Sequence, residues 1–65
     1  MSDFKTRLQA EQSELQEKLD KLKGFIGTEN FLSISREQQA LLNIQSASME
    51  TYSKCLEERI KNLEG

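Results

Sequence analysis

The 65-residue chain contains no histidine, no proline and no tryptophan, and it has a single cysteine. Without histidine it lacks the commonest general base and the commonest metal ligand of proteins. One cysteine cannot form a disulfide within the chain, which is the usual condition in a reducing compartment. Because proline is the residue that most often breaks helices, its absence permits long uninterrupted ones.

Long apolar runs are missing as well. The longest is Ala40-Leu41-Leu42, whereas a helix that spans a membrane needs about 20 predominantly apolar residues. The first residues, Met1-Ser2-Asp3-Phe4, lack the apolar core of a signal peptide, so the cytoplasm is the expected location. A net charge of −2 argues against a general nucleic-acid binder, which carries a basic excess. The length allows one domain, 1–65.

The first part of the chain carries apolar residues at helical spacing. They are Phe4, Leu8, Leu15, Leu19, Leu22, Phe25 and Ile26. Their steps of mainly three, four and seven residues place them on one helix face and fit no strand. We therefore expect a first helix over about 3–26. One of the two nearby glycines, Gly24 or Gly27, is expected to take the left-handed conformation that commonly ends helices.

The stretch from Ser35 to Leu63 predicts a second helix, over about 36–63. Leu42, Met49, Leu56 and Leu63 recur every seven residues, with Gln45, Tyr52 and Arg59 three places after the first three. On a helix these positions form the a/d seam of a heptad pattern. Polar groups within the two seams would be Glu11, Lys18, Gln45 and Arg59; they either define register or are solvated edges of a narrow interface. Ser35, three residues before Gln38, forms a capping-box pattern.

The connector, about 27–35, holds Phe31, Leu32 and Ile34, which is too apolar for a loose loop. We expect it to form a short helical turn that closes the end of a hairpin. The predicted fold class is therefore all-α, an antiparallel two-helix hairpin with a short helical connector. Such a hairpin covers one side of each helix, so a homo-oligomer is expected, with Leu42, Met49 and Leu56 covered partly by a second copy. Packing within one chain alone is the alternative.

The residues that could support catalysis are few. Acidic residues are spread along both predicted helices and lack the Glu-x-x-His spacing of di-metal bundles, and no glycine-rich phosphate loop occurs. Cys55 has no histidine partner and is expected to be a small buried or half-buried apolar side chain. We expect no enzymatic activity, no cofactor and no metal site.

A binding function has more support near the N-terminus. Phe4, Lys5 and Arg7 lie within one turn of each other, where helix amides also offer free donors. An aromatic ring, two cations and exposed amides suit a ligand that carries bases and phosphates. The alternative is that Phe4 only packs at the helix end and the cations are solvated.

The chain resembles a family of small phage hairpin proteins. In the first helix the resemblance lies in Phe4-Lys5-Thr6-Arg7-Leu8, Glu11, Leu15, Lys18, Lys21-Leu22 and Phe25-Ile26; in the second it lies in Leu41-Leu42, Gln45, Met49, Tyr52, Leu56 and Arg59-Ile60. The family's characterised members are anti-CBASS and anti-Thoeris sponges. They are compact helical homo-oligomers, commonly hexamers, that sequester cyclic-nucleotide immune signals without degrading them. The resemblance implies the same activity here, in the cytoplasm of an infected bacterial host.

The resemblance also implies ligand-binding roles for individual residues. Phe4 matches a family aromatic that stacks on a nucleobase; tyrosine is common there, so a hydroxyl contact is in doubt. Arg7 aligns with the family's usual arginine. Lys18 or Lys21 matches a lysine that contacts the ligand from a neighbouring protomer, and the sequence does not distinguish them. The implied partners are a cyclic dinucleotide or related cyclic nucleotide and further copies of the chain, with no DNA, RNA or membrane.

Two other functions remain open on the sequence. An amphipathic helix face could inhibit a host protein by packing on it. The hairpin could also be a purely structural module that assembles without a ligand.

Overall fold

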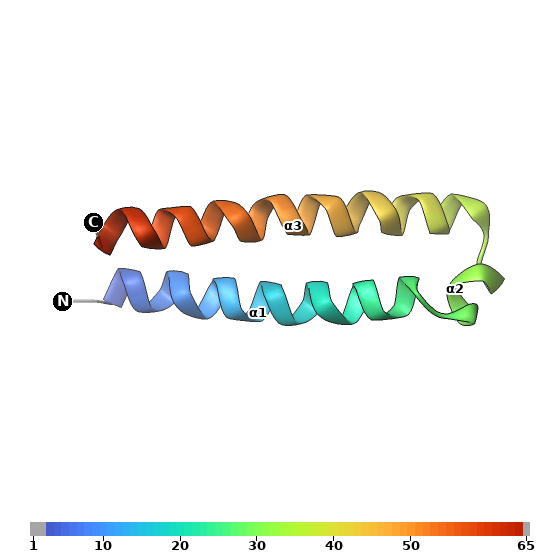
Figure 1. Cartoon of the computed structure of the whole chain (residues 1–65), viewed down its shortest axis with the longest axis horizontal. Helices are drawn as coiled ribbons and strands as arrows, with labels where there is room; N and C mark the ends of the chain where they lie inside the picture. The colour runs from blue at the N-terminus through green and yellow to red at the C-terminus, as the bar shows by residue number, and fades with distance from the viewer. Residues whose placement is uncertain (1–2, 65) are drawn as a thin grey trace.

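The computed structural model describes residues 3–64, and within them it contains three α-helices. These are α1 (Asp3–Ile26), α2 (Glu29–Ser33) and α3 (Arg36–Glu64). The two long helices lie antiparallel and side by side, with α2 at the turn and the start of α1 beside the end of α3 (Figure 1). The Cα trace measures 48 × 14 × 13 Å along its principal axes. The prediction of an all-helical pair joined by a helical connector is confirmed.

The two long helices meet along a seam in which inward residues alternate at steps of three and four. On α1 the seam contains Lys5, Leu8, Gln12, Leu15, Leu19, Leu22 and Ile26; on α3 it contains Gln39, Leu42, Ser46, Met49, Ser53, Leu56 and Ile60. All of these side chains are buried or half-buried. This alternation is the a/d pattern of a coiled-coil pair.

The prediction that the residues three places after each member of the seven-residue repeat in α3 lie in the seam was wrong. Gln45, Tyr52 and Arg59, three places after each repeated residue, are exposed in the structure. Their places in the seam are taken by the residues four after, Ser46, Ser53 and Ile60. On a helix, positions three and four along lie on opposite sides of a given residue, about −60° and +40° from it. The side on which α1 packs selects the second set.

The same correction applies to α1. Glu11 and Lys18 are exposed, and Gln12 and Leu19, one residue further along, lie in the seam. The interpretation of Glu11, Lys18, Gln45 and Arg59 as polar groups inside the seam of this hairpin is therefore wrong. The polar residues that do lie in the seam are Lys5, Gln12, Gln39, Ser46 and Ser53.

Burial by the chain itself corrects two further expectations. Leu56 is 0% exposed within one chain, so it needs no second copy to cover it. Leu42 and Met49 are half-buried. Cys55, expected to be at least half-buried, is exposed. The cause is the same helical geometry: the residue before Leu56 is turned about 100° away from it.

The turn after α1 uses a threonine where we expected a left-handed glycine. No glycine within residues 3–64 has a positive φ. Instead, both the backbone N–H and the hydroxyl of Thr28 donate to the carbonyl of Phe25, at 3.0 and 2.6 Å. These two bonds satisfy a carbonyl that the helix end would leave without a partner.

A buried aromatic pair closes the turn end of the hairpin. Phe31 of α2 is buried, and its ring meets the ring of Phe25 edge-on, with centroids 6.0 Å apart and an interplanar angle of 84°. Leu32, expected to share this role, is 71% exposed. The start of α3 follows the predicted cap, because the Ser35 hydroxyl accepts from the backbone N–H of Gln38 at 3.2 Å.

Candidate functional site

The four residues to which the resemblance assigned ligand roles lie along the exposed surface of α1. Phe4 is 57% exposed, and the side chains of Arg7, Lys18 and Lys21 are also exposed. Phe4 and Arg7 form one pair and Lys18 and Lys21 another. The 14 residues from Phe4 to Lys18 span about 21 Å of helix. The nearest members of the two pairs, Arg7 and Lys18, are still about 16.5 Å apart along the helix, so the pairs do not form one compact site in a single chain.

Phe4 has a partner that sequence reasoning missed. The guanidinium carbon of Arg59 lies 5.9 Å from the centre of the Phe4 ring, within cation–π distance. The antiparallel pairing brings these two residues together although 54 others separate them in the sequence. Arg7 lies one helical turn after Phe4 and pairs with Asp3 at 3.4 Å. We call Phe4, Arg7 and Arg59 the aromatic–cation cluster.

The chemistry of the aromatic–cation cluster suits a nucleotide. An exposed aromatic ring offers a flat face on which a base can stack. Guanidinium groups are planar donors that match the oxygens of a phosphate. The ion pair of Arg7 with Asp3 is solvent-exposed, so it contributes little and can be exchanged for a ligand anion.

A further contact ties the helices along the same edge. The Tyr52 hydroxyl donates to a carboxylate oxygen of Glu11. This hydrogen bond is the main cause that raises the pKa of Tyr52 above its ordinary value, and desolvation acts in the same direction. Glu11 therefore has a structural partner in place of the seam position expected for it.

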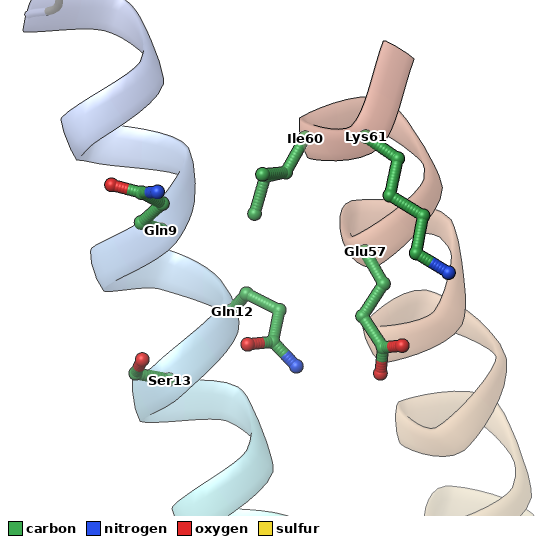
Figure 2. A pocket seen from close by; sticks show the side chains of 6 residues that line it. All are labelled: Gln9, Gln12, Ser13, Glu57, Ile60 and Lys61. Carbon is green, nitrogen blue, oxygen red and sulfur yellow. The ribbon is translucent and has the colours of Figure 1, made fainter. Parts of the chain in front are cut away.

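A groove lies on a different edge of the hairpin from Phe4. Its volume is about 450 Å³, and Figure 2 shows its lining: Gln9, Gln12 and Ser13 from α1, and Glu57, Ile60 and Lys61 from α3. Gln9 follows Phe4 by five residues, which turns it about 140° around α1. None of the predicted site residues lines this groove. Its lining combines amides and a hydroxyl with one carboxylate, Glu57, and one ammonium group, Lys61, a mixed set that favours no single class of ligand.

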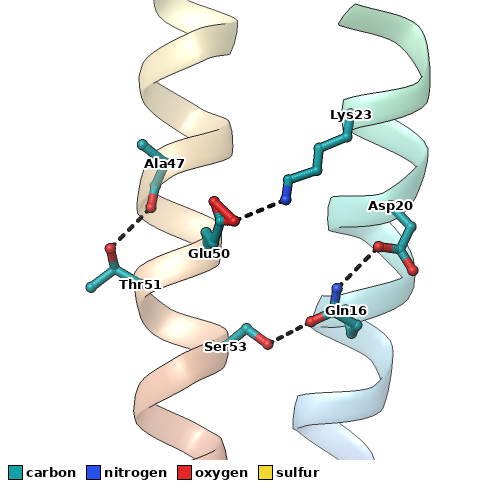
Figure 3. Close-up of polar contacts among 7 residues, drawn as sticks. All are labelled: Gln16, Asp20, Lys23, Ala47, Glu50, Thr51 and Ser53. Atoms are coloured by element: carbon teal, nitrogen blue, oxygen red, sulfur yellow. Dashed lines mark hydrogen bonds and ion pairs between the residues drawn. The ribbon is translucent and has the colours of Figure 1, made fainter. Parts of the chain in front are cut away.

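Further along this edge, polar side chains bond to each other across the seam (Figure 3). Ser53, only 2% exposed, accepts a hydrogen bond from the Gln12 amide at 3.1 Å and donates one to Gln16 at 2.9 Å. Lys23 pairs with Glu50 at 2.8 Å, and this hydrogen bond is the main cause that lowers the pKa of Glu50. No buried side-chain nitrogen or oxygen within residues 3–64 lacks a partner. This network holds the hairpin together and offers no unpaired group to a ligand.

The described part of the chain has neither a cluster of metal-ligating side chains nor a helix that could span a membrane. Residues 3–64 contain no group of three or more Cys, Asp or Glu side chains arranged to hold a metal ion. No helix in the same range is both long and apolar enough to cross a bilayer.

Comparison with known proteins links the chain to one family. The sequence profile of the Sequestin family matches residues 2–62. The chain is also 37% identical over 60 residues to a protein of Enterobacteria phage T4 described as "Uncharacterized 7.5 kDa protein in denB-rIIB intergenic region". That alignment covers 92% of this chain and 94% of the phage protein. No solved structure matches. Since the profile covers nearly the whole sequence, the chain belongs to the Sequestin family.

Proposed function

We propose that this protein is a phage anti-defence protein that binds and sequesters a cyclic-nucleotide immune signal without cleaving it. It would act in the cytoplasm of the infected bacterium against CBASS or Thoeris signalling. Membership of the Sequestin family, whose name points to sequestration, supports this proposal, as does the similarity to a phage T4 protein. Within the structure, the observation that carries it is the exposed Phe4 ring with Arg59 beside it.

The ligand chemistry fits this pair in two ways. A cyclic dinucleotide has two flat bases and two negatively charged phosphates. One base would stack on the side of the Phe4 ring that Arg59 leaves open, while a guanidinium of Arg59 or Arg7 would pair with a phosphate. Arg59 is thus an addition to the residues that the resemblance implied.

Lys18 and Lys21 enter the proposal only through a neighbouring copy. They lie about 21 Å or more along α1 from Phe4, which is far for a small ligand stacked on that ring in the same chain. A homo-oligomer, a hexamer if this member follows the sponge proteins it resembles, would bring the lysines of one copy to the aromatic–cation cluster of another. The ligand site would then lie between copies.

The expectation that the ligand is released unchanged is supported by the residues available. The chain has no histidine to act as a general base, and residues 3–64 hold no cluster of potential metal ligands. A phosphodiester bound by Phe4 and the arginines would meet guanidinium groups that neutralise its charge.

Calorimetric titration with a panel of cyclic di- and trinucleotides tests the proposal. We expect Phe4→Ala to weaken binding about ten- to a hundredfold, the value of one base–aromatic stack. The matched control is Leu32→Ala, which removes an even more exposed apolar side chain at the opposite end and should bind as the wild type does. Arg59→Ala and Arg7→Ala should weaken binding in a salt-dependent way, because screening acts on charge and barely on stacking.

Ligand recovered from the complex should be chemically intact by mass spectrometry. If the wild type binds none of these nucleotides at micromolar concentrations, sequestration of cyclic nucleotides is refuted. Inhibition of a host protein by a helix face would then be the next function to test.

A further inference from the structure

α3 has a second apolar face that the hairpin leaves uncovered. Leu41, Ile44 and Tyr52 are exposed there, Ile44 to 62%, and the small residues Ser48 and Cys55 lie between and after them. These five residues, the outer face of α3, fall within an arc of about 80° that is centred about 130° from the seam. Tyr52 lies at the edge of the arc nearest α1, where its hydroxyl bonds to Glu11. Glu37 and Arg59 fall within the same arc beyond its two ends along the helix. Tyr52, which the sequence pattern assigned to the seam, lies on this face.

The outer face of α3 lies largely in an uncharged segment. From residue 38 to residue 49 there is no Asp, Glu, Lys or Arg, although 31% of the whole chain is charged. A solvated face of a soluble helix normally carries charges opposite its buried stripe. Their absence over three turns indicates a surface that is covered by another molecule.

The surface area of the chain shows how much remains to be covered. Its accessible surface is 5046 Å². A compact monomer of 7.5 kDa would expose only about 4,200 Å². The excess of roughly 800 Å² is the area that one partner contributes to a protein–protein interface of standard size. The side-by-side helices of Figure 1 explain the excess, because each covers only one side of the other.

We infer that a second copy of this chain packs on the outer face of α3, with the two α3 helices antiparallel and Ser48 near the two-fold axis. The inference deepens the proposed function, which needs an assembly to form a site between copies. A symmetric pair uses the same patch on both partners, so the patch must be complementary to itself. With Ser48 at the axis, the uncharged segment of one copy lies opposite residues 47–58 of the other, and because it carries no charge it opposes no like charges there.

The distribution of large and small side chains selects the antiparallel order. With Ser48 at the axis, Leu41 of one copy lies opposite Cys55 of the other, so a large side chain meets a small one at each end, and Ile44 lies opposite Tyr52. In parallel order Leu41 would meet Leu41 and Cys55 would meet Cys55, which spaces the helices unevenly and leaves voids. Antiparallel order also places the positive N-terminal end of one α3 near the negative C-terminal end of its partner.

Sedimentation over the micromolar range, without any nucleotide, tests whether the outer face of α3 binds a second copy. We expect the wild type to self-associate and Ile44→Glu to raise the dissociation constant at least about 30-fold, because each copy would bury an unpaired charge. Glutamate is a good helix former at a position exposed in the single chain, so the helical circular dichroism should persist. The matched control is Leu32→Glu, which changes a more exposed leucine outside this face and should associate as the wild type does.

Mild oxidation of Leu41→Cys beside the wild type tests the order of the helices, because parallel helices would cross-link both proteins. In the antiparallel pair the new cysteine lies opposite the partner's Cys55, and the variant should form a disulfide-linked dimer. Wild-type protein should not, because its two Cys55 residues would lie about 21 Å apart along the axis; a disulfide needs Cα atoms within about 7 Å.

Four results would overturn the inference: a wild type that stays monomeric throughout the range, an Ile44→Glu variant that associates normally, a Leu41→Cys variant that does not cross-link, or a wild type that cross-links through Cys55. These measurements contain no ligand. A failure of cyclic-nucleotide binding by an associated wild type would therefore refute the proposed function and leave the interface in place.

Discussion

Replacing Ser53 by alanine tests whether the polar layer in the seam stabilises the hairpin. The Ser53 hydroxyl makes two hydrogen bonds, one from Gln12 and one to Gln16, and it is nearly inaccessible to water. Each bond contributes a net of about 0.5–1.5 kcal/mol, so the upper limit of the loss is roughly 3 kcal/mol. The half-buried glutamines can bind water instead, and alanine favours helix by up to about 0.5 kcal/mol. We expect a net destabilisation of about 1–2 kcal/mol.

Ser46→Ala is the matched control for this change. Ser46 occupies the same seam position one heptad earlier and is half-buried. Within residues 3–64 its side chain forms no hydrogen bond. Its replacement should leave stability unchanged or raise it by up to about 0.5 kcal/mol. Urea unfolding followed by circular dichroism measures the free energy of unfolding of both variants. Both are measured at the same protein concentration, so that self-association contributes equally. If the two variants unfold within about 0.5 kcal/mol of each other, the Ser53 hydrogen bonds do not stabilise the hairpin.

Three further predictions concern other contacts between α1 and α3. Tyr52 is the only tyrosine and there is no tryptophan, so ultraviolet titration should report the pKa of Tyr52 directly. We expect this pKa to lie above 10.0 in the wild type and to be lower in Glu11→Gln. Equal titration midpoints would contradict the hydrogen bond to Glu11. The raised pKa means that this contribution to stability is present below pH 10 and is lost as the pH rises through the folded-state value. For Glu50 the sign is opposite, because its pKa is lowered: the stability that this gives is present above the ordinary value of 4.5 and is lost as the pH falls through the folded-state value. Lys23→Gln should therefore be less stable than the wild type at pH 7 and equal to it in strong acid. A difference that does not change with pH would show that Lys23 acts by packing alone. Leu56→Ala should cost about 2–5 kcal/mol, as much as a core this small supplies, and a cooperatively folded variant of wild-type stability would contradict the placement of Leu56 at the centre of the seam.

Part of the candidate site was accessible from the sequence. Phe4 and Arg7 are three residues apart, so any helix places them on one side. The pairing of Phe4 with Arg59 depends on the register between α1 and α3. The spacing of residues within one helix gives no information on that register. The sequence did show a cation near the end of the second predicted helix, but without the register it could not be assigned to the ring.

What the sequence determined by itself is the set of helices and the place where the chain turns. Apolar steps of three, four and seven residues, the lack of proline and the Ser35 cap are local features, and they act on the backbone within one or two turns. Which side of each helix faces inward was decided only by the tertiary structure. Around the seven-residue repeat, Tyr52 and Ser53 are nearly equivalent companions of Met49 on an isolated helix, since they flank it at about −60° and +40°. The packing of α1 on one of these two flanks buries Ser53 and leaves Tyr52 and Cys55 at the surface.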